Sequence, residues 1–205
     1  MRIKNWKKWD LFDEQDDLYK LQELNFYDQE INEIPREIEN LTNPSIMKFE
    51  CNKIITIPKE IGNLVNLTGL YFSYNYISQI PKEMGKLINL QKLSLSRNKI
   101  REIPEEIGNL INLQKLFANN NEISKIPTRI DRLINLKKLW LENNRIKEFP
   151  RGILNLINLE ELSIYGNVKK KEENTFYPKK EIKKLSGLRI WFSGNHDRLV
   201  SEIWN

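Results

Sequence analysis

Apolar residues recur along this chain every 23 residues, at the same places within each unit. In the unit from Leu90 to Asn112 they occupy positions 1, 4, 6, 11, 14, 18 and 21. Positions 4 and 6 alternate with polar neighbours, which is the period of a β-strand. Positions 14, 18 and 21 have the spacing of a helix face, and the proline at position 15 suits the first turn of a helix. Each unit is therefore predicted to fold as a strand, a turn and a short helix. The units open at Leu21, Leu67, Leu90, Leu113, Leu136 and Leu159, with Pro44 in the slot after Leu21.

A period of this length predicts a solenoid of stacked units rather than a globular core. Strands of successive units should pair side by side into a parallel sheet. With 205 residues, 40% of them hydrophobic, the chain is long enough for one domain with its own core. Because a solenoid presents a broad surface and rarely builds an enclosed catalytic pocket, the pattern favours binding over catalysis.

Position 9 of the unit is asparagine in six units. A buried polar side chain at a fixed position needs a fixed hydrogen-bond partner. We expect each amide to bond the backbone of its own and the neighbouring unit, and so to form a structural ladder. Its members are Asn52, Asn75, Asn98, Asn121, Asn144 and Asn167, with Gln29 at that position in the first unit.

The run LxxLxLxxNxIxxIPxxIxxLxx, repeated from about Leu18 to Asn195, resembles the leucine-rich repeat. It is most similar to the 23-residue form of bacterial repeat proteins and of intracellular Ras-associated ones. The resemblance implies an α/β fold, a curved horseshoe with a concave parallel β-sheet of about eight strands and short helices on the convex side. Family members mostly bind other proteins, so the resemblance also implies a module for protein–protein interaction.

The pattern divides the chain into four parts. Residues 1–20 are predicted to form an N-terminal helical cap, and residues 21–166 the regular repeats. Residues 167–195 form an irregular last repeat with a basic insertion, and residues 196–205 a C-terminal cap. The caps are expected because an open terminal repeat would expose its apolar face. Within the first cap, Trp6 and Trp9 either cover the first strand or serve as an exposed anchor for a partner.

Large side chains gather at positions 5 and 7, which should point out of the concave face of the sheet. Position 5 is aromatic in four of the eight units, and Phe117 and Trp140 on adjacent strands should touch. Exposed aromatics are common anchors of binding sites, although aromatics also favour strands for structural reasons. The candidate residues for binding a partner are Tyr71, Arg97, Phe117, Trp140, Glu142, Tyr165 and Trp191.

Charge adds a second possibility. The formal net charge is +5, and residues 168–184 hold seven Lys against three Glu. Along the concave face the first unit is acidic and the middle units are basic, which would orient a partner of mixed charge. We expect a monomer that binds an unidentified protein. The alternative is binding of a polyanion, an acidic membrane or a nucleic acid, through Lys169–Lys184, with nucleic acid the less favoured.

Residues for catalysis are scarce, so we expect no enzyme, no metal and no cofactor. The single histidine, His196, stands beside Asp197 with no nucleophile apparent, and the single cysteine, Cys51, excludes an internal disulfide. No phosphate-binding loop or zinc spacing is present. The chain has no visible secretory signal and no apolar run of membrane length. It is therefore expected in the cytoplasm, or exported by a route or signal not visible in the sequence.

Overall fold

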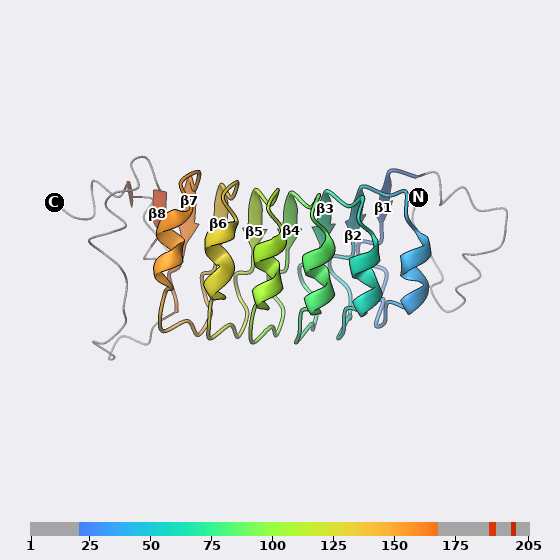
Figure 1. Ribbon diagram of the computed structural model, residues 1–205. Coiled ribbons are helices and arrows are strands. Elements are labelled where there is room, and N and C mark those ends of the chain that lie inside the picture. Colours follow the sequence, from blue (N-terminus) through green and yellow to red (C-terminus); the bar gives the residue numbers. More distant parts are fainter. Residues whose placement is uncertain (1–20, 168–188, 192–197, 200–205) are drawn as a thin grey trace.

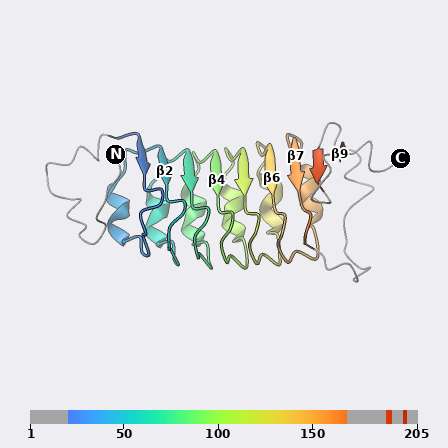
Figure 2. The same cartoon turned by 180° about the vertical axis from the view of Figure 1, so that it is seen from behind.

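The computed structural model describes residues 21–167, 189–191 and 198–199, and its strands form one sheet in chain order. Seven successive strands pair in parallel with the next, so the prediction of about eight parallel strands is confirmed. Figures 1 and 2 show the parallel strands as a single open row from β1 to β8, and β9 lies beyond β8. The strands are β1 Glu23–Asn25, β2 Ile46–Lys48, β3 Gly69–Tyr71, β4 Lys92–Ser94, β5 Lys115–Phe117, β6 Lys138–Trp140, β7 Glu161–Ser163, β8 Arg189–Trp191 and β9 Arg198–Leu199.

The register of the sheet follows the repeat. Leu93 at position 4 pairs with Leu116, which pairs in turn with Leu139, so equal positions of successive repeats lie side by side. The last strand differs, because β9 runs antiparallel to β8. That pairing falls in the segment predicted as the C-terminal cap, where the repeat pattern has already ended.

The helical segments are shorter than an α-helix of ordinary length. Each is a five-residue 3-10 helix that starts directly after the proline at position 15, and each ends where the backbone N–H of a leucine bonds the carbonyl three residues earlier. Figure 1 shows all of them on one side of the sheet, and Figure 2 shows the strands in front from the other side. The predicted short helices are thus present as 3-10 turns: η3 Arg36–Asn40, η4 Lys59–Asn63, η5 Lys82–Lys86, η6 Glu105–Asn109, η7 Thr128–Arg132 and η8 Arg151–Asn155.

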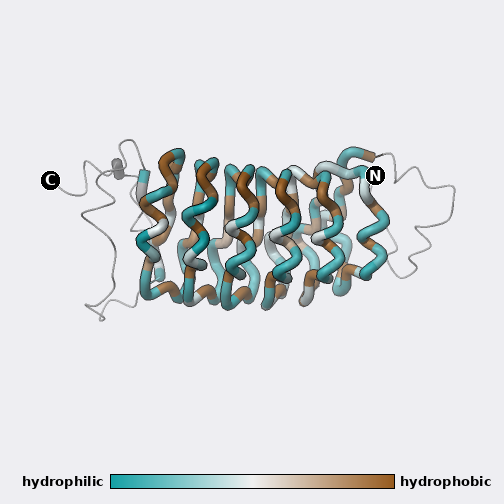
Figure 3. Tube along the Cα trace, in the orientation of Figure 1, coloured by the Kyte–Doolittle hydropathy of each residue, from teal (hydrophilic) through white to brown (hydrophobic). Residues whose placement is uncertain are grey.

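The core lies between the sheet and the 3-10 helices and runs as one cluster through the described repeats. Hydrophobic stretches of the trace recur in each repeat in Figure 3, as the 23-residue pattern requires. At position 6, the buried rings of Phe26, Phe49 and Phe72 stack with centroids 4.9 and 5.1 Å apart. Further along the chain the same position is held by smaller residues, including Ala118.

The position-9 asparagines join neighbouring repeats through their buried amides. Asn98 donates from Nδ2 to the carbonyl of Phe72 in the preceding repeat at 2.9 Å and to that of Leu95 at 3.0 Å. Its Oδ1 accepts the backbone N–H of Ile77 at 3.0 Å. The same two sets of bonds recur at Asn52, Asn75, Asn121, Asn144 and Asn167.

Candidate functional site

The aromatic pair at the centre of the predicted site lies on adjacent strands. The register of β5 and β6 places Phe117 opposite Trp140, and their rings lie with centroids 4.6 Å apart and tilted by 49°. Position 4 of both strands points into the core, so the position-5 rings point out of the opposite face of the sheet, which the prediction treats as concave. Both rings are half-buried, which leaves part of their surface open to a partner.

The remaining aromatics are distributed around this pair. Tyr165 follows β7, and its carbonyl accepts the N–H of Asn143 at 2.8 Å, which brings the Tyr165 backbone alongside the sixth repeat. Tyr71 on β3 is two strands from Phe117, because Ser94 on β4 lies between them. Burial raises the pKa of the Tyr71 phenol. The aromatic strip is therefore the group Phe117, Trp140 and Tyr165, with Tyr71 separate from it.

Glu142 lies within this strip and is almost completely buried, at 7% exposed. Burial raises the pKa of its carboxyl, and hydrogen bonds from its own backbone N–H and from Ser163 oppose the rise. Among the described residues, Glu142 Oε2 and Trp140 Nε1 are the two buried side-chain polar atoms without a hydrogen-bond partner. Trp140 is the last residue of β6, and Glu142 follows it by two residues.

Two further candidates do not join the strip in the described structure. Arg97 has a left-handed backbone, with φ of 54°, and its guanidinium lies 5.1 Å from the centre of the Tyr74 ring. Its charge is thus directed to a residue of the preceding repeat and away from Phe117. The backbone of Trp191 pairs with Ser163 in β8, but its side chain lies outside the described part.

Charges around the strip are largely paired across neighbouring repeats. Lys138 contacts Glu161 at 2.7 Å, Lys137 contacts Glu160 at 3.5 Å, and Arg145 contacts Glu122 at 3.2 Å. Near the first repeat, Lys48 contacts Glu23 at 2.6 Å. These pairs reduce the contrast between an acidic end and a basic middle that the sequence predicts.

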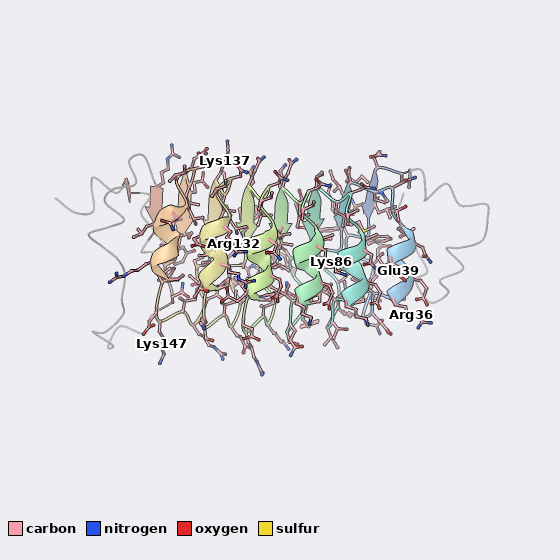
Figure 4. All side chains as sticks on the ribbon, viewed as in Figure 1. Arg36, Glu39, Lys86, Arg132, Lys137 and Lys147 are labelled. Atoms are coloured by element: carbon pink, nitrogen blue, oxygen red, sulfur yellow. The ribbon has the colours of Figure 1, made fainter. Side chains whose placement is uncertain are left out.

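The edge of the repeat array formed by the loops that lead into the strands carries features that were not predicted from the sequence. Position 22 is an exposed valine or isoleucine in five successive repeats. Position 23 is an asparagine, and its amide bonds the position-22 carbonyl of the preceding repeat, as Asn112 does with Ile88 at 2.9 Å. A shallow polar depression of about 230 Å³ lies along this edge, between Gln91, Gln114 and Lys137. Figure 4 shows Lys137 at the edge, whereas Lys86 and Arg132 lie on the helices. This edge could have been found in the sequence from the 23-residue spacing of its exposed apolar residues, which are Val65, Ile88, Ile111, Ile134 and Ile157.

The described part of the chain contains neither a cluster of metal ligands nor a helix of membrane length. It holds no group of three or more His, Cys, Asp or Glu side chains placed to bind a metal ion. No helix there is long and apolar enough to cross a membrane. His196, Trp6, Trp9 and the basic segment Lys169–Lys184 lie outside the described residues, so the predictions made for them stay predictions.

Comparison with known families identifies the repeat. Residues 78–203 match a family model described as a leucine-rich repeat region, and residues 47–100 match a second described as a leucine rich repeat. The chain belongs to the leucine-rich repeat family. Membership supports a role in protein interaction, since leucine-rich repeat domains are typically non-catalytic interaction modules. A search of the curated proteins finds no match.

Two solved leucine-rich repeat structures illustrate the fold. An internalin from Listeria monocytogenes is similar over 91% of this chain, with a TM-score of 0.75 and 24% identity. The ectodomain of the plant membrane receptor kinase GASSHO1/SCHENGEN3 from Arabidopsis thaliana, solved in complex with CASPARIAN STRIP INTEGRITY FACTOR 2, is similar over 87%, with a TM-score of 0.75 and 26% identity. The present chain spans 52% of the internalin and 22% of the receptor ectodomain.

Proposed function

We propose that this leucine-rich repeat protein is a non-catalytic module that binds a protein partner across its concave face, with the aromatic strip as the anchor. The observation that supports this most is the contact between Phe117 and Trp140 on the solvent side of the sheet. Two large, half-buried rings held rigid by adjacent strands lose little conformational entropy on binding, and such residues dominate interface energetics.

The surroundings of the strip support the same proposal. Strands β5 and β6 are each paired with a neighbouring strand on both sides, so a partner on the strip must be recognised mainly through side chains. The rim consists mostly of paired charges, which contribute more to specificity and association rate than to affinity. The Arabidopsis ectodomain, whose structure was solved with a bound factor, is an example of a similar repeat array engaged by a ligand.

Affinity capture with the purified chain tests the proposal. Trp140→Ala should reduce recovery of the specific partner by about 30-fold or more, because loss of an anchor of this kind costs at least ~2 kcal/mol. Quantitative mass spectrometry of the captured proteins would measure the change. The matched control is Tyr76→Ala, which removes a 50% exposed ring outside the strip. Equal capture of the same proteins by wild type and Trp140→Ala, with both folded, would place the binding surface elsewhere.

A further inference from the structure

The carboxylate of Glu142 stands apart from the other described glutamates of the sheet. Glu23, Glu161 and Glu122 each contact a lysine or arginine within 4 Å. Burial raises the pKa of Glu50, the second glutamate of the position-7 column, but the charge of nearby Lys48 opposes the rise. Glu142 is 7% exposed, yet no described lysine or arginine forms an ion pair with it, and its Oε2 has no hydrogen-bond partner.

Such a group is costly to keep in the free protein. Removing a carboxylate from water without a compensating charge is unfavourable by several kcal/mol, unless it takes up a proton or gains a cation. Nothing in the core requires an acid at this place, because the neighbouring repeats place Asn119 and Tyr165 at the same position of the column. A buried, uncompensated carboxylate on the proposed binding face is therefore a candidate receptor for a group supplied from outside.

The immediate neighbours narrow the chemistry of that group. Trp140 precedes Glu142 by two residues on the same face, the Phe117 ring lies against Trp140, and Tyr165 belongs to the adjacent repeat. The faces of aromatic rings attract cations, most strongly at desolvated sites. An anion close in the fold to aromatic rings matches a lysine ammonium or an arginine guanidinium, whose aliphatic stem packs on rings while its head reaches the charge.

We propose that the protein partner inserts one lysine or arginine side chain into the aromatic strip and pairs it with Glu142. This inference rests on the proposed function, because it requires a partner on the concave face. The rings of Trp140 and Tyr165 are half-buried, so part of their surface is open to a side chain of the partner. A carboxamide from the partner could instead use Trp140 Nε1 and Glu142 Oε2 together, but it would leave the buried charge uncompensated. The cation is therefore the better match.

Selection from a random-peptide phage library provides ligands of known sequence for the test. Peptides are selected on the wild-type chain, and those whose binding is lost with Trp140→Ala are kept. Each is measured by fluorescence anisotropy against wild type, Glu142→Gln and Trp140→Phe. We expect these peptides to share one basic residue. Its replacement by norleucine should weaken binding to wild type about 30-fold, but binding to Glu142→Gln by less than about threefold. Trp140→Phe should bind more weakly than wild type but still require the basic residue, because a smaller aromatic face remains.

The outcomes separate this inference from the proposed function. Peptides that depend on Trp140 but need no basic residue, or whose basic residue is equally important with Glu142→Gln, overturn the inference and leave the proposed function standing. A requirement for Asn or Gln together with loss of binding to Trp140→Phe overturns it in favour of the carboxamide. A failure to select any peptide that depends on Trp140 or Phe117 counts against both. Thermal melts of each variant confirm that the comparison is made between folded proteins.

Discussion

At the scale of single residues, the position-9 amide is the side chain on which the stack depends most directly. Asn121 accepts the N–H of Ile100 at 3.0 Å and donates to the carbonyls of Leu95 and Ala118 at 2.9 and 3.1 Å. Asn121→Ala leaves these buried groups unpaired, so we expect a loss of about 2–4 kcal/mol in the free energy of unfolding, measured by urea denaturation.

The exposed ladder offers the matched control for that prediction. Asn112 also bonds a carbonyl of the preceding repeat, at 2.9 Å, but at the exposed edge, where water can replace it. Asn112→Ala should therefore cost less than about 1 kcal/mol. Equal losses for the two variants would show that burial of the amide is not what makes the position-9 bonds important.

Glu142 should make stability depend on pH. Burial raises the pKa of its carboxyl in the folded state above the ordinary value of about 4.3. At pH values between the ordinary pKa and the raised pKa of the folded state, the folded state binds more protons than the unfolded state. The free energy of unfolding therefore falls as pH rises through this range. Glu142→Gln has no such proton to lose. Its melting temperature relative to wild type should therefore increase from about pH 4 toward neutrality. The expected increase is about 2–4 °C for each kcal/mol of unfolding free energy that wild type loses over this range. A constant difference in Tm between the two proteins across that range would contradict the prediction.

At the scale of elements, small residues set how closely successive 3-10 helices pack. A Cβ added at Gly108 would lie 2.7 Å from the Cβ of Arg129 in the next repeat and still closer to its carbonyl oxygen. Gly108→Ala must push η6 and η7 apart, so we expect a loss of about 1–3 kcal/mol by urea denaturation. At Gly69 the added Cβ would meet the ring of Tyr71 at 3.0 Å, and that side chain can move. Gly69→Ala should therefore change stability by less than about 1 kcal/mol, and a comparable loss in both variants would refute the packing argument.

The order of the elements could be predicted from the sequence because each one follows from a local pattern. Alternation at positions 4 and 6 indicates the strand, and the proline at position 15 marks the start of the helical turn. The 3-10 form was not predictable from apolar spacing, because five residues give too few positions to separate it from an α-helix. The left-handed backbone conformation at position 8 could not be predicted from the sequence either. Asn120 and Asn143 are residue types that tolerate it, but Cys51, Tyr74 and Arg97 give no such indication.

From the sequence, the candidate site could be predicted only as a set of residues at equivalent positions of successive repeats, without their side-chain contacts. Parallel register fixes which residues are neighbours, so the contact between Phe117 and Trp140 was within reach of the sequence. The isolation of Glu142 was not, because it depends on where the neighbouring cations place their charges. Lys138 is directed to Glu161, and Arg145 to Glu122. Such choices among side-chain partners are made by three-dimensional distances that the repeat pattern does not encode.

At the scale of the whole molecule, the array should behave as a chain of coupled repeats rather than as one core. Most element-to-element packing joins each repeat to the next, through the sheet on one side and the 3-10 helices on the other. Stability in such a chain is approximately a sum of repeat and interface contributions. Damage in one repeat should therefore weaken its neighbours most and leave distant repeats protected.

Phe49 is the residue at which to test this, because its ring stacks between Phe26 and Phe72 and so contributes to two interfaces. Phe49→Ala removes both stacks and leaves a cavity, for which we expect a cost of about 3–5 kcal/mol. In native-state hydrogen exchange, the resulting loss of amide protection should concentrate in residues 21–80, whereas residues 113–164 should exchange as in wild type. Leu162→Ala, at a buried position of β7, is the reciprocal control and should shift the loss to the other end of the described repeats. A uniform loss of protection in both variants would mean that the repeats unfold as a single cooperative unit, because only then would a local cavity weaken every repeat equally.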